Sequence, residues 1–169
     1  MQSKADGKKE TIAWIQEHFP INSSILDVGT GHAATYRKLL PEYPNMYGVE
    51  VFPSNADKVK DLYKELYNVN IMDFDWTDKF YDLIIFGDIL EHLTIQDAQK
   101  ILKIAAEHCQ DLIVAVPFEY PQGICYGNKY EIHLQPDLTK ETMAERYPDL
   151  EILVDPGNNY CYYHKKFPC

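Results

Sequence analysis

Short apolar runs alternate with amphipathic segments along most of this 169-residue chain, and this alternation limits its fold more than any other feature. The apolar runs, which we interpret as strands, are 24–28, 46–50, 69–73, 82–86 and 112–116. Strands that alternate with helices are typical of βαβ units and a mostly parallel sheet. Because the runs are apolar almost throughout, we expect helices on both faces of that sheet.

Helical spacing of apolar residues predicts helices over 8–18, 32–40, 54–67, 94–109 and 137–147. Ser54 and Thr94 are the expected N-caps of two of them, and Asp97 lies three residues after Thr94. The turn-forming residues 156–159 join two short strands near the end, which predicts a hairpin. We therefore expect a doubly wound α/β fold with a mostly parallel, seven-stranded sheet and a C-terminal antiparallel hairpin.

Length and composition restrict the class of protein further. We expect one domain over residues 1–169, with a disordered polar segment at 1–7. The net charge of −10 disfavours a nucleic-acid partner, and no apolar stretch approaches the ~20 residues that cross a membrane. The four cysteines include no CxxC pair, which favours a cytoplasmic protein with reduced thiols. The Cys and His spacings match no metal clip, so we expect no metal site.

Candidate ligand-binding residues follow the expected strands, because such sheets bind ligands outside the carboxyl ends of their strands. Gly29 and Gly31 lie between the first strand and the next helix, and Ala34 completes a loose dinucleotide fingerprint. Asp27 precedes this loop, where its carboxylate would repel a pyrophosphate. An acid here instead favours S-adenosylmethionine, which carries an ammonium and a sulfonium but no phosphate.

Acidic residues also end the next two expected strands. Glu50 lies 23 positions after Asp27, and an acid there can accept hydrogen bonds from both hydroxyls of a ribose. Asp73 can accept from an adenine amino group, and the flanking Phe74 can cover the adenine ring. Each of these acids has an alternative role as an ordinary loop or solvent-exposed residue.

Taken together, segments 25–31, 47–52, 73–74, 81–93 and 112–117 resemble the ordered motifs of class I S-adenosylmethionine-dependent methyltransferases. The resemblance extends from about residue 10 to residue 165 and implies a Rossmann-like fold with S-adenosylmethionine as cofactor. The residues it assigns to the cofactor are Asp27, Gly29, Thr30, Gly31, Glu50, Val51, Asp73, Phe74, Gly87 and Asp88.

The resemblance implies methyl transfer to an acceptor, for which a general base is needed only if the acceptor is protonated. His92 lies one helical turn after Asp88, and with His133 it is a candidate catalytic residue. The alternative for His92 is a hydrogen bond to the backbone. The long segment after the fifth strand is a candidate acceptor wall. Its candidate substrate-binding residues are Glu119, Tyr120, Tyr126 and Tyr130.

Several functional alternatives remain open at this point. Ala33 replaces a glycine found in many members, so a non-catalytic domain that binds the cofactor or serves as a scaffold is the second hypothesis. The third is a nicotinamide-dependent oxidoreductase, which only the loose glycine fingerprint supports. We expect a small-molecule acceptor and a monomer or homodimer. Aromatic residues of the hairpin could form the dimer contact, namely Tyr160, Tyr162 and Tyr163.

Overall fold

The computed structural model describes residues 7–125 and 127–168. Its helices are α1 (Lys8–His18), α2 (Thr35–Leu39), α3 (Pro53–Val59), α4 (Ile95–Ala106) and α5 (Lys140–Arg146). Its strands are β1 (Ile25–Val28), β2 (Met46–Val49), β3 (Glu65–Tyr67), β4 (Tyr81–Gly87), β5 (Cys109–Pro117), β6 (Glu151–Asn158) and β7 (Tyr160–Lys166). Most of the segment expected to be disordered lies outside the described residues.

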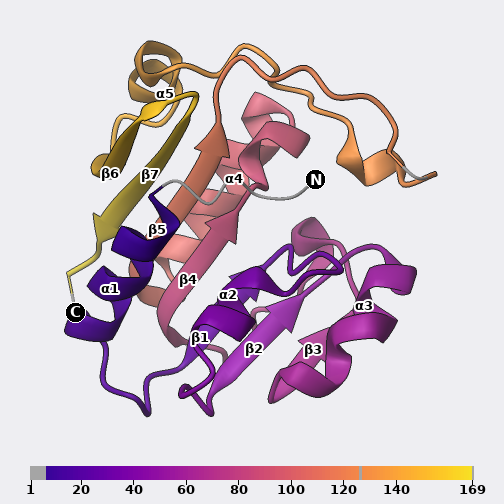
Figure 1. Cartoon of the computed structure of the whole chain (residues 1–169), viewed down its shortest axis with the longest axis vertical. Coiled ribbons are helices and arrows are strands. Elements are labelled where there is room, and N and C mark those ends of the chain that lie inside the picture. Colours follow the sequence, from indigo (N-terminus) through magenta and orange to yellow (C-terminus); the bar gives the residue numbers. More distant parts are fainter. Residues whose placement is uncertain (1–6, 126, 169) are drawn as a thin grey trace.

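The strands form one seven-stranded sheet in the order β3-β2-β1-β4-β5-β7-β6. The first five in this order run parallel, and β7 pairs antiparallel with both β5 and β6. The chain moves outward from β1 to β3 and then returns to place β4 on the other side of β1 (Figure 1). This confirms the predicted doubly wound sheet and its C-terminal hairpin.

Helices cover both faces of the sheet, as the apolar strands predicted. Leu26 and Val28 pack into the hydrophobic cluster that includes α4 and α5, whereas Ile25 packs into the cluster that includes α1, α2 and α3. In Figure 1, α1 and α2 lie in front of the sheet and α4 lies behind it. Because side chains alternate along a strand, Asp27 faces the same side as Ile25.

The inner strand of the hairpin, β7, is part of the core. Tyr160 and Tyr162 are among the largest fully buried side chains, and Tyr163 is 3% exposed. The expectation that these tyrosines form a dimer contact is therefore wrong, because the protein itself buries them. The run of tyrosines suggested an exposed surface because the sequence does not show that the hairpin pairs with β5. That pairing buries aromatic residues that an unpaired terminal hairpin would expose.

The third strand is the main error of the sequence interpretation. β3 lies within the segment expected to continue the helix 54–67, and the expected strand 69–73 contains a 3₁₀ turn, Ile71–Asp73. Val59 and Tyr63 have helical spacing and are buried, but Leu62 is exposed and the following residues pair with the free edge of β2. Sheet pairing thus overrides the helical pattern. α3 also begins at Pro53, with Ser54 inside the helix and not at its N-cap.

Other helix boundaries depend on local backbone geometry. Thr94 caps α4 as predicted, since its hydroxyl accepts a 3.1 Å hydrogen bond from the Asp97 amide and donates one to the Asp97 carboxylate. α2 begins later than expected because Ala34 has a left-handed conformation, with φ of 46°. Within the described part of the chain, every helix is too short or too polar to cross a membrane.

Candidate active site

A cavity of about 350 Å³ opens at the carboxyl ends of the parallel strands, beside the point where the strand order reverses. Its volume lies in the range typical of small-molecule sites. Its walls are the loop between β1 and α2, the residues that end β2 and β4, and the segment 128–134 after β5. Figure 1 shows that this last segment extends from the end of β5 toward the side of the molecule that holds α3.

The glycine loop has a conformation that requires glycine. Gly29 has φ of +75°, and a Cβ atom built there would lie 2.0 Å from Cδ1 of Ile89. The Gly31 amide donates a 2.8 Å hydrogen bond to Oε2 of Glu50, and the Phe52 amide donates to Oε1 over the same distance. Burial raises the pKa of Glu50, and the two amides oppose that shift. Glu50 therefore fixes the loop in addition to lining the cavity.

Asp27 presents a buried carboxylate to the cavity. Its side chain is almost fully buried and accepts a 2.7 Å hydrogen bond from the Tyr63 hydroxyl. Burial raises the pKa of Asp27 to about 6, while the Tyr63 bond and the nearby Lys8 charge oppose the shift. A cation that binds next to such a buried acid stabilises its charged form.

Two further charged side chains lie at the same end of the cavity. Lys8, from the first turn of α1, lines the cavity, and its ammonium lies 4.8 Å from the centroid of the Tyr36 ring. Burial lowers the pKa of Lys8, whereas Asp88 and Asp27 raise it. Asp88 has a left-handed backbone, with φ of 57°, and accepts a hydrogen bond from the Tyr160 hydroxyl. The sequence does not mark Lys8 for this position, because nothing in α1 indicates that tertiary packing buries its first lysine.

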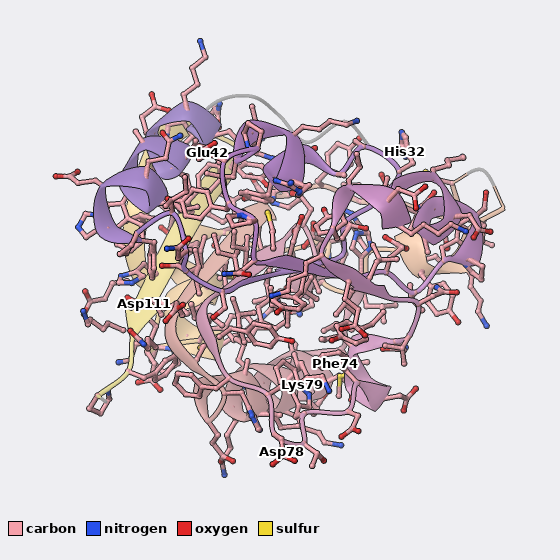
Figure 2. The ribbon with its side chains drawn as sticks, turned by 90° about the horizontal axis from the view of Figure 1, so that it is seen from below. His32, Glu42, Phe74, Asp78, Lys79 and Asp111 are labelled. Atoms are coloured by element: carbon pink, nitrogen blue, oxygen red, sulfur yellow. The ribbon has the colours of Figure 1, made fainter. Side chains whose placement is uncertain are left out.

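Most of the predicted cofactor-binding residues line this one cavity. They are Asp27, Gly29, Thr30, Gly31, Glu50, Val51, Gly87 and Asp88. Asp73 is exposed and Phe74 is buried in the core against Tyr67 and Trp76, so neither lines the cavity. In Figure 2, Phe74 lies beside Lys79, across the sheet from His32. Residues 69–71 line the cavity in their place.

The predicted catalytic histidines contact each other. His92 lines the cavity, and the centroid of its ring lies 4.6 Å from that of His133 in an edge-to-face arrangement. Burial lowers the pKa of both imidazoles. Each Nδ1 bonds to a backbone carbonyl oxygen, His92 to Ile132 and His133 to Tyr120, which agrees with the backbone-bonded alternative for His92.

The predicted acceptor residues divide into three groups. Tyr130 lines the cavity, whereas Glu119 and Tyr120 are exposed and lie outside its wall. Tyr126 lies outside the described residues. Further residues of the cavity wall that were not predicted from the sequence include Lys8, His32, Asn70, Ile71, Ile89, Asn128 and Leu134. They belong to no recognised motif, so tertiary contacts alone identify them.

Solved structures share this fold. An S-adenosylmethionine-dependent methyltransferase from Clostridium acetobutylicum ATCC 824 aligns over 100% of this chain and 93% of its own, with 12% identity and a TM-score of 0.71. The methyltransferase domain of bacterial CtHen1-CN aligns over 94% and 96%, with 19% identity and a TM-score of 0.67. Magnesium protoporphyrin IX methyltransferase from Synechocystis PCC 6803 with bound SAM aligns over 95% and 77%, with 11% identity and a TM-score of 0.66.

The sequence comparisons identify the family directly. A comparison with curated proteins finds no match. The family model described as a methyltransferase domain matches residues 4–166, which include every element of the sheet. This match agrees with the motif resemblance and with the position of the cavity. The chain therefore belongs to the methyltransferase domain family.

Proposed function

We propose that this protein transfers a methyl group from S-adenosylmethionine to a small-molecule acceptor bound in the cavity. The observation that carries the proposal is the buried Asp27 carboxylate, which faces the cavity beside the glycine loop. A cationic nucleoside would stabilise its charged form, whereas a pyrophosphate would not. The family match and a structural neighbour with bound SAM support the same cofactor.

The cavity offers a complementary group for each part of that cofactor. Asp27 would bind the ammonium and Lys8 the carboxylate of the methionine portion. Glu50 would accept hydrogen bonds from the ribose hydroxyls. We assign the adenine contact to the cavity residues Asn70 and Ile71, in place of Asp73 and Phe74. Thr30, Val51, Gly87 and Asp88 would complete the wall around the cofactor.

The acceptor would occupy the side of the cavity formed by His92 and Tyr130. The positive sulfur of S-adenosylmethionine activates the methyl group, so the protein acts chiefly by holding the acceptor in line with it. The acceptor's lone pair forms the new bond to carbon while the carbon–sulfur pair returns to sulfur. His92 would orient the acceptor from a ring held by Ile132. One structural neighbour, magnesium protoporphyrin IX methyltransferase, is named after a small molecule.

Calorimetric titration with S-adenosylhomocysteine tests the cofactor assignment. We expect saturable binding by the wild type and none by Asp27→Lys, which places a cation where the cofactor's ammonium would lie. Glu42→Lys provides the control, since Glu42 is exposed and outside the cavity wall. No binding at millimolar S-adenosylhomocysteine by a folded wild-type sample would contradict the proposal.

Turnover separates an enzyme from a non-catalytic domain. We expect the wild type to release S-adenosylhomocysteine from S-adenosylmethionine when a small-molecule fraction of a cell extract supplies the acceptor. Asp27→Lys should release none. Cofactor binding without release would favour the non-catalytic alternative, and enhanced NADH fluorescence on mixing would favour an oxidoreductase.

A further inference from the structure

Three potential metal ligands cluster at the edge of the cavity. Glu91 and His92 belong to the 3₁₀ turn Leu90–His92 after β4, and His133 comes from the segment after β5. One ligand-capable atom from each of the three lies within 4.8 Å of those of the other two. The metal prediction from sequence examined cysteine and histidine spacing, so it did not consider a carboxylate and two histidines that only tertiary folding brings together.

Two members of this cluster, Glu91 and His133, have buried polar atoms without partners among the described residues. Glu91 is 1% exposed, and neither of its carboxylate oxygens has a hydrogen-bond partner among the described residues. Nε2 of His133 is likewise buried and unpartnered within the described part of the chain. Buried polar groups without partners are costly, and a buried carboxylate more so. The carboxylates of Asp88 and Glu131, which act on Glu91, have the same sign and add to the effect of burial. A bound cation would satisfy these groups together.

The two imidazoles are oriented as metal ligands usually are. A carbonyl oxygen only accepts hydrogen bonds, so the bonds to Ile132 and Tyr120 require a proton on Nδ1 of each ring. The lone pair of each neutral ring is then on Nε2. Histidine ligands in proteins commonly donate their other ring N–H to a carbonyl in this way.

The backbone also holds the cluster together before any ion binds. The amides of Leu134 and Gln135 donate hydrogen bonds of 2.7 and 3.1 Å to the Glu91 carbonyl oxygen. The Gln135 side chain donates to the Leu90 carbonyl oxygen over 2.8 Å. The segment that carries His133 is thus tied to the turn that carries Glu91, which gives a preorganised set of ligands.

We propose that Glu91, His92 and His133 bind one divalent transition-metal ion through a carboxylate oxygen and two Nε2 atoms. Two imidazoles and one carboxylate suit ions such as Zn²⁺ or Co²⁺ better than Mg²⁺ or Ca²⁺, which prefer oxygen ligands. Three protein ligands leave coordination positions open. His92 lines the cavity, so those positions would be accessible from the acceptor side.

This position has a consequence for the acceptor, which rests on the methyl transfer proposed above. An acceptor hydroxyl bound to the ion would lose its proton to solvent more readily, because a metal ion lowers the pKa of a bound O–H group. The resulting oxygen would form the bond to the methyl carbon, and the electron pair of the carbon–sulfur bond would return to sulfur. The site therefore favours a hydroxyl compound as the acceptor class.

Metal titration of the untagged full chain tests the site directly. After chelation and dialysis, Co²⁺ is added and followed by visible absorption, and Zn²⁺ is added and followed by calorimetry. We expect one ion per chain. Glu91→Gln, His92→Gln and His133→Gln should each weaken metal binding at least tenfold. Loss of a residue that merely hydrogen-bonds to a metal ligand already costs about tenfold or more in metal affinity, and a ligand itself should cost no less. His32→Gln is the matched control, because His32 also lines the cavity but lies outside the cluster.

Absence of stoichiometric binding by folded wild-type protein would overturn the proposal, as would equal affinities in the three variants and the control. Glu91 and His133 are buried, so His92→Gln keeps the test valid if the other two replacements prevent folding. Titration with S-adenosylhomocysteine on the same samples separates the two proposals. Metal binding without cofactor binding would leave the site intact and contradict the methyl-transfer function, and the reverse result would contradict the site alone.

Discussion

Tyr63 donates a 2.7 Å hydrogen bond to the carboxylate of Asp27; both side chains are buried, and Asp27 is part of the cavity wall. The bond stabilises the charged form of Asp27, whereas burial favours its neutral form. Burial has the larger effect, so the site holds a carboxylate whose charge is costly until a cation binds. This balance between the two effects leads to the first two predictions.

Asp27→Asn should stabilise the protein at neutral pH while removing cofactor binding. The pKa of Asp27 is about 6 in the folded protein, against an ordinary value of 3.8. The folded state therefore binds the proton more tightly, and stability falls as pH rises through this window. Asparagine avoids that loss and still accepts from Tyr63, so the variant should gain up to about 3 kcal/mol above pH 6. Urea unfolding at about pH 5 and pH 7.5 measures it; a difference between variant and wild type that does not grow with pH would contradict it.

Tyr63→Phe should shift the pH dependence of cofactor binding upward. Loss of the hydroxyl removes a bond that lowers the pKa of Asp27, so this carboxyl would take up a proton at higher pH. The ammonium of the cofactor binds the charged form of Asp27, so wild-type affinity should fall as pH drops through about 6. The affinity of the variant should begin to fall at a higher pH. Calorimetric titrations with S-adenosylhomocysteine across this range give both midpoints. Tyr67→Phe is the control, because its hydroxyl bonds to the exposed Glu65; identical midpoints in Tyr63→Phe and wild type would refute the prediction.

Gly29→Ala should destabilise the protein more than Gly157→Ala does. The two glycines have nearly equal φ values, +75° and +74°, so the left-handed strain is matched. A Cβ atom at Gly29 overlaps Ile89, whereas one at Gly157 meets nothing within 4 Å. Overpacking of this kind costs about 1–3 kcal/mol beyond the shared strain. Ile89→Ala in the Gly29→Ala background should recover part of the difference in denaturant unfolding, and equal losses for the two glycine variants would exclude the overlap as the cause.

Thr94→Ala should lower stability by about 1 kcal/mol without changing cofactor affinity. The substitution removes the side chain that accepts from the Asp97 amide at the start of α4. Thr94 is exposed and outside the cavity wall, so the binding site should be unaffected. Thr94→Ser keeps the hydroxyl and should match the wild type in thermal unfolding. A loss of the same size in Thr94→Ser would show that the cap is not responsible.

Much of the architecture was predictable because its signals are local. The runs that became β1, β4 and β5 are apolar almost throughout, since helices cover them on both sides, and Thr94 marks the start of α4 through residues that are close in sequence. The glycine loop and Glu50 could be placed for a similar reason. Parallel strands end at one edge of the sheet, so residues just after them meet whatever the rest of the chain does.

The failures share a dependence on long-range packing. β3 forms because the edge of β2 is free, although its residues continue a helical pattern. Asp73 ends the misplaced strand and Phe74 follows it, so both were predicted at a position that residues 69–71 occupy in the structure. The environment of Glu91 depends on a segment that follows the next strand, and its sequence neighbours do not distinguish a buried acid from an exposed one.

Lys8 extends the candidate site beyond the recognisable motifs. The motif resemblances begin at β1, yet α1 contributes a cation to the same cavity from the opposite end of the helix that leads into that strand. A fragment trimmed to start at β1 would retain each glycine and acid that defines the family pattern, but its binding site would be one charge more negative. Domain boundaries drawn for expression should therefore keep α1 intact, and bulky fusions placed directly against Gly7 should be avoided, because Gly7 packs against Tyr162.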